Sequence, residues 1–210
     1  MDMRSKLLEA TARVYAETGY RGATTRRIAL EAGVNEVTLF RHFGSKDALI
    51  QEALSHADAG EQRAALPNLP VDPRRELVER CRDQFKQLHS IRSIIRKVMG
   101  EMEEHPEIVQ FGMACPMHAG HELSAYFTRL RANGLSRADA EPRAAAKLLM
   151  SAVFSEAMSR DIMPKSEMLP LDRAIDTYVD MILRAVGIAD DAATRARPRT
   201  RSRPKRSDRH

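Results

Sequence analysis

Residues 22–49 concentrate side chains that can hydrogen-bond to the free ends of helices and to nucleic acid. Thr24 or Thr25, Asn35 and Ser45 can each cap the start of a helix, and Gly33 suits the tight turn that ends one. Their order therefore predicts two short helices that form a helix-turn-helix, followed by a longer helix.

The helix that follows Asn35 is expected to have two chemically different faces. Leu39 and Phe43 lie on one side of it, where they can pack against the rest of the domain. At 100° per residue, the opposite side carries residues with no packing reason to be there, namely Val37, Thr38, Phe40 and Arg41. A helix that enters a major groove needs this design, because its outer face must offer donors and apolar atoms to base edges.

Each of these residues also has a plain structural reading. Thr24, Thr25 and Asn35 could be helix caps and nothing more, because phosphate contacts and caps often use the same groups. Phe40 could belong to the core, and Lys46 could be a solvated lysine in the first turn of its helix. Arg41 lies opposite the apolar face, which favours contact with a base or a phosphate.

The same segment resembles the DNA-binding domain of TetR-type (tetracycline-repressor-like) regulators. The residues that carry the resemblance are Thr24-Thr25, Gly33-Val34, Thr38-Leu39-Phe40-Arg41-His42-Phe43 and Lys46-Asp47-Ala48-Leu49. The resemblance implies a DNA-binding set in which Asn35 caps the recognition helix, Arg26, Glu36, Val37, Thr38 and Arg41 approach bases, and Thr24, Thr25, His42 and Lys46 approach phosphates. Phe40 replaces a common tyrosine and lacks its hydroxyl, and acidic Glu36 must accept from a cytosine amino group or point away.

The rest of the chain is predicted to be helical as well, so the fold class is all-α with about nine helices. Apolar residues recur at helical spacing, and no convincing run alternates as a strand would. The expected helices beyond the motif cover about residues 4–17, 73–88, 91–104, 116–133, 142–161 and 170–186. We expect a DNA-binding domain at 1–56, an effector-binding and dimerisation domain at 57–188, and a disordered Arg-rich tail at 189–210.

The net charge of +5 comes from that tail, because residues 195–210 hold eight Lys and Arg against one Asp. Bulk charge therefore does not by itself indicate nucleic-acid binding. The start of the chain lacks the apolar stretch of a signal peptide, and the two cysteines do not make a disulfide framework, so we expect a cytoplasmic protein. No segment is apolar enough for a membrane span.

Three possible metal ligands lie close together in the sequence, namely Cys115, His118 and His121. A helix that starts at Pro116 would turn His118 and His121 away from its core face, so both can be ordinary exposed histidines that bind no metal. Cys81 is expected to be an apolar filler. We predict no metal, no cofactor and no enzymatic activity, since no Gly-rich phosphate loop, nucleophile elbow or zinc-binding helix motif is present.

The resemblance places a ligand pocket in the central helices. The Met and aromatic residues available there are Phe85, Met99, Met102, Phe111, Met113, Tyr126, Phe127, Met150 and Phe154. The same residues would equally build an ordinary helical core. The resemblance also points to the last two helices as the dimer interface.

The predicted function is a homodimeric transcriptional regulator, acting as a repressor that a small-molecule effector releases from a palindromic stretch of double-stranded DNA. One recognition helix reads only a few base pairs, so two half-sites are needed. Two rivals are a non-specific nucleic-acid-binding protein that acts through its basic tail and a helical enzyme.

Overall fold

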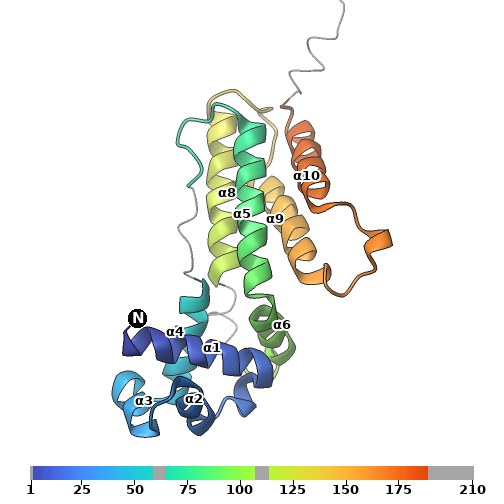
Figure 1. The fold of residues 1–210 in the computed structure, drawn as a ribbon. Coiled ribbons are helices and arrows are strands. Elements are labelled where there is room, and N and C mark those ends of the chain that lie inside the picture. The colour runs from blue at the N-terminus through green and yellow to red at the C-terminus, as the bar shows by residue number, and fades with distance from the viewer. Residues whose placement is uncertain (1, 59–64, 107–113, 189–210) are drawn as a thin grey trace, which may run out of the picture.

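The computed structural model describes residues 2–58, 65–106 and 114–188, and within them every regular element is helical. The all-α prediction is therefore confirmed. The α-helices are α1 Met3–Gly22, α2 Thr25–Ala32, α3 Glu36–Phe43, α4 Lys46–Asp58, α5 Pro73–Ser90, α6 Arg92–Glu101, α8 Ala114–Ala132, α9 Pro142–Ser159 and α10 Leu171–Ala185, and a short 3-10 turn spans Lys165–Glu167. Figure 1 shows α1 to α4 gathered at one end and α5, α8, α9 and α10 as a bundle beyond them.

The N-terminal helices begin where their local sequence signals predict. Thr24 accepts a hydrogen bond from the backbone N–H of Arg27 at 3.3 Å, and Asn35 accepts one from Thr38 at 2.9 Å. Ser45 caps α4 in the same way, through the Ala48 N–H at 3.1 Å. The large side chains that hold these helices together are fully buried, among them Leu7, Tyr15, Ile28, Leu39, Leu49 and Ile50.

The first helix differs from its predicted end. α1 continues to Gly22 across a break at Gly19, whose φ of 70° lies in the left-handed region that glycine adopts without strain. A Cβ at Gly19 would also lie 1.9 Å from the carboxylate oxygen Oε1 of Glu101. Gly19 therefore ends the first segment of α1, close to the predicted end near residue 17, and in addition makes room for a side chain from α6.

The helices of the bundle share one apolar core. Leu77, Cys81, Leu123, Leu149 and Val179, drawn from four helices, are each at most 2% exposed. Burial raises the pKa of the Cys81 thiol to about 12, so this cysteine is an apolar filler as predicted. The predicted start of one helix at Pro116 is wrong, because α8 already includes Ala114, and proline is tolerated in a first helical turn.

The helix α6 belongs to both cores. Ile95 is buried in the core of the C-terminal bundle, whereas Val98, one turn later, is buried among the N-terminal helices. At the end of α6, Glu101 accepts a hydrogen bond from the Tyr15 hydroxyl at 2.8 Å and one from the Tyr20 backbone N–H at 3.0 Å. A change in the bundle that moves α6 must therefore act on α1.

Candidate nucleic-acid interface

The two faces of α3 are as the sequence predicts. Leu39 is fully buried and Phe43 is 8% exposed, whereas Val37 and Phe40 are 74% and 46% exposed. Arg41 is exposed on the same side as Val37, one turn further along the helix. The outer face of α3 thus combines a cation with two apolar side chains, which suits contact with base edges in a groove.

Intramolecular ion pairs separate the arginines of the N-terminal helices into two groups. Four of them pair with carboxylates, Arg4 with Glu52, Arg13 with Glu31, Arg21 with Glu104 and Arg27 with Glu17. Among the described residues, Arg26 and Arg41 make no ion pair or hydrogen bond through their guanidinium groups. The two arginines that the sequence analysis placed near bases therefore keep all their side-chain donors available.

Glu36, the acidic residue at the start of α3, has a partner inside the domain. Its Oε2 accepts a hydrogen bond from the Thr25 hydroxyl at 2.7 Å, which ties the start of α3 to the start of α2. Both side chains are half-buried. Of the two options left open for Glu36, this geometry favours the one in which it turns away from cytosine and positions the helices.

Lys46 is held by contacts inside the protein. Its Nζ donates to the backbone carbonyl oxygen of Tyr20 at 2.5 Å and lies 4.3 Å from the centre of the Tyr20 ring. Desolvation lowers the pKa of this lysine, opposed by the nearby charges of Asp47 and Glu101. This packing role of Lys46 has no local sequence signal, because its partner Tyr20 lies 26 positions earlier in the chain.

The remaining predicted DNA contacts are distributed around α2 and α3. Thr24 and Asn35 are exposed cap residues, so each combines the structural reading with a position open to solvent. His42 is half-buried beside Phe43, with 6.2 Å between their ring centres. Leu30 was not among the predicted contacts, yet it is 80% exposed one turn after Arg26 on α2. Its position four residues after Arg26 puts both side chains on one face of α2, and this spacing could have revealed it from the sequence.

The predicted ligand-pocket residues do not all come together. Phe85, Tyr126, Phe127 and Met150 are buried in the core of the bundle, and Phe154 packs against it. Met99 and Met102 instead lie at the surface, 46% and 45% exposed, while Phe111 and Met113 lie outside the described residues. The pocket therefore remains a proposal, and four buried side chains define its possible walls.

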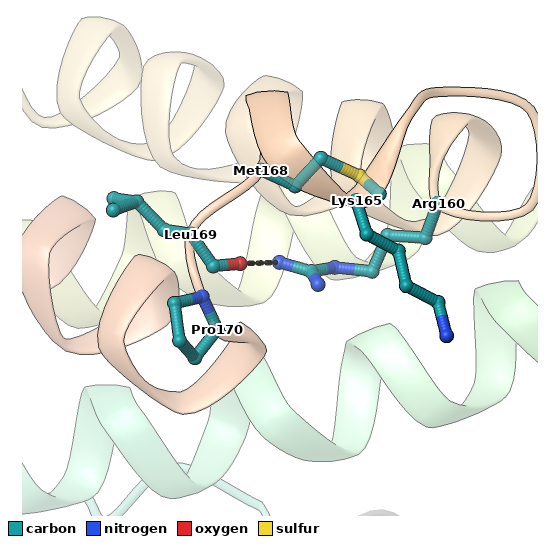
Figure 2. Close-up of a pocket in the computed structure, with 5 residues that line it drawn as sticks. All are labelled: Arg160, Lys165, Met168, Leu169 and Pro170. Carbon is teal, nitrogen blue, oxygen red and sulfur yellow. Dashed lines mark hydrogen bonds between the residues drawn. The ribbon is translucent and has the colours of Figure 1, made fainter.

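Hollows at two places on the surface of the described residues contain none of the predicted pocket residues. Figure 2 shows one of them between the end of α9 and the start of α10, where Arg160 donates to the Leu169 carbonyl oxygen at 2.8 Å. The other lies along α6 and includes Arg96 and Glu101. The first combines Arg160 and Lys165 with Met168, Leu169 and Pro170, and the second is lined by polar and charged side chains of α6.

Within residues 2–58, 65–106 and 114–188, no group of His, Cys, Asp and Glu side chains is arranged to hold a metal ion. His121 is exposed on α8, and the side chains of Cys115 and His118 lie outside the described part. No helix among the described residues is long and apolar enough to span a membrane.

Comparisons with known proteins agree with this arrangement. Residues 7–53 match the family model of bacterial regulatory proteins of the tetR family, and residues 76–187 match that of the C-terminal domain of AefR-like transcriptional repressors. The transcriptional repressor AcnR of Corynebacterium efficiens is 41% identical over 59 residues, which cover 28% of this chain and only 31% of AcnR. The transcriptional regulator YvkB of Bacillus subtilis is 25% identical over 149 residues, 71% of this chain and 78% of YvkB.

The fold is shared with solved structures. A crystal structure assigned to the TetR family, from Mesorhizobium loti, has a TM-score of 0.71 at 20% identity and covers 87% of this chain and 96% of its own. The second family match alone, residues 76–187, spans more than half of the 210 residues. The chain therefore belongs to the tetR family of bacterial regulatory proteins.

Proposed function

We propose that the protein is a sequence-specific DNA-binding transcriptional repressor that acts in the cytoplasm without catalysis. The observation that carries this proposal is the outer face of α3, where Arg41 has no partner within the described part of the chain and Val37 is 74% exposed. A planar fork of donors beside an apolar side chain can distinguish bases by both hydrogen bonds and methyl contacts. The repressor name of AcnR, which is 41% identical to this chain over 59 residues, supports repression as the direction of regulation.

We further propose that two chains bind one palindromic operator. α3 is only eight residues long, so one copy reads few base pairs and useful specificity needs a second half-site. Large apolar side chains remain exposed on the last two helices, with Leu148 of α9 at 63% and Met181 of α10 at 57%. Figure 1 shows α9 and α10 next to each other at one side of the bundle. A second copy seated there would cover these residues.

A small-molecule effector is proposed to release the operator by changing the spacing of the two recognition helices. Such a ligand must bind the DNA-binding conformation and the released conformation with unequal affinity, and its effect must reach the N-terminal helices. α6 offers the route, because Val98 sits in the N-terminal core and Glu101 holds the break in α1. Arg92 and Arg96 at the other side of α6 both pair with Asp161 beyond the end of α9, so α6 is tied to the proposed dimer helices as well.

Selection from a library of random DNA duplexes tests the proposed function directly. We expect repeated selection with the full chain to enrich one inverted repeat, whose half-sites lie one helical turn or a multiple of it apart, about 34 to 36 Å per turn. Enrichment of no sequence, with binding that depends on salt alone, would contradict the proposal.

The exposed Val37 predicts a contact with a thymine methyl group in each half-site. Replacing that thymine with deoxyuridine removes only the methyl, so operator affinity should fall by about three- to tenfold while all hydrogen bonds to the base remain. In the Val37→Ala variant the same base change should have little further effect on affinity, because the contact between the valine side chain and the thymine methyl is already absent. Competition titrations with each thymine replaced in turn measure both, and a full set of replacements without effect would rule out methyl recognition.

A further inference from the structure

A polar cluster lies inside the otherwise apolar bundle, between α5 and α8. Arg80 is 3% exposed and Gln84, one turn later on α5, is 1% exposed. Arg80 Nη2 donates to Glu122 Oε2 of α8 at 2.8 Å, and Nη1 donates to Gln84 Oε1 at 3.0 Å. The third nitrogen, Nε of Arg80, is buried and has no hydrogen-bond partner among the described residues.

Stability does not account for this cluster. Removing a guanidinium from water costs several kcal/mol, and apolar side chains of similar volume often stabilise a core as well as a buried ion pair does or better. An unpaired buried donor adds the further cost of the hydrogen bond that it made to water in the unfolded chain. The neighbouring positions of α5, Leu77, Cys81 and Phe85, show that the surrounding core is built from apolar residues. Packing alone therefore gives no reason for an arginine at position 80.

We propose that Arg80 and Gln84 form the subsite that binds the carboxylate of an amphipathic organic acid. The inference rests on the proposed function, since it names the chemical class of the effector. A planar guanidinium binds a carboxylate through two parallel hydrogen bonds, and the buried Nε supplies a donor that no group of the described residues uses. The apolar part of the acid then packs among core residues such as Phe85 and Phe127.

Charge balance explains how an anion enters this interior. The Glu122 side chain is 31% exposed while that of Arg80 is 2% exposed, so the ion pair has one partner at the edge of the core and one inside it. An incoming carboxylate takes the place of Glu122 on Arg80, and Glu122 turns into water. The guanidinium remains paired with one carboxylate throughout, and no unpaired charge is buried.

This exchange would also carry the signal. The Arg80–Glu122 ion pair ties α5 to α8, and a ligand that replaces it releases that tie. α5 ends at Ser90 and α6 begins at Arg92, so a shift of α5 passes directly into the helix whose Val98 lies in the N-terminal core. The acid therefore favours a state with a different placement of the recognition helices.

Calorimetric titration of the full chain tests the subsite without DNA. The probes are octanoate, decanoate and 4-phenylbutyrate, each compared with the primary alcohol of the same skeleton. We expect each acid that binds to do so about tenfold or more tightly than its alcohol, and Arg80→Met to remove this preference. Arg75→Met is the matched control, because Arg75 lies on α5 with an exposed side chain paired to Glu79 and should leave binding unchanged.

Circular dichroism and melting curves establish that each variant is folded, and Arg80→Lys keeps a buried cation if Arg80→Met does not fold. With Arg80→Lys the affinity for the acids should fall several-fold while a preference over the alcohols remains. Acids that bind no better than alcohols, that do not bind at about 5 mM, or that bind Arg80→Met unchanged would overturn the subsite. Acid binding without operator binding would contradict the proposed function and leave the subsite standing.

Discussion

Placing arginine at both Leu148 and Met181 is expected to give a monomer that binds its operator about a hundredfold more weakly than the natural chain. Two half-sites held by one dimer bind with the advantage of effective concentration, which a monomer loses entirely. The two side chains are 63% and 57% exposed in the single chain, so the substitutions should not disturb its fold. Light scattering gives the molar mass, and titration with operator DNA gives the affinity.

Leu69→Arg is the control for this pair. Leu69 is 66% exposed and belongs to the segment before α5 rather than to α9 or α10, so the same change of chemistry there should leave mass and affinity unaltered. A Leu148→Arg, Met181→Arg chain that stays dimeric and binds normally would show that these helices do not form the interface.

Arg41→Ala should weaken operator binding by about 1–3 kcal/mol and relax the preference at one base position in each half-site, if Arg41 reads a guanine. Binding to scrambled DNA should change much less, because the substitution removes only one of the positive charges that can lie near a phosphate. The matched control is Arg27→Ala, since Arg27 lies in the same small domain but is paired with Glu17. Titrations of each variant against the operator and its single-base variants measure both effects. An Arg27→Ala chain that loses base preference while Arg41→Ala keeps it would reverse the assignment.

The helix starts and the outer face of α3 could be predicted because their causes are local. Thr24, Asn35, Ser45 and Asp72 each cap a helix through a backbone N–H three residues later, so the signal lies within four positions of sequence. The orientation of α3 follows from its own periodicity, which places Leu39 and Phe43 on the side opposite Val37 and Arg41.

The contacts that tie distant segments together could not be predicted in this way. Lys46 bonds to Tyr20, and Tyr15 bonds to Glu101, 86 positions away, and neither pair has a local pattern that reveals it. The same reason explains the two surface methionines, Met99 and Met102: a periodic pattern shows that a helix has an apolar face but not whether another helix covers it.

The central claim is that the helix-turn-helix, and not the basic C-terminal segment, reads the DNA sequence. The most direct test is to delete residues 195–210, which hold eight Lys and Arg, and to titrate both chains against operator and scrambled DNA at several salt concentrations. Deletion should weaken all DNA binding alike and reduce the salt dependence by about 0.9 in log–log slope per lost phosphate contact, while the ratio of operator to scrambled affinity is unchanged. A shortened chain that remains folded but no longer prefers the operator would contradict the claim.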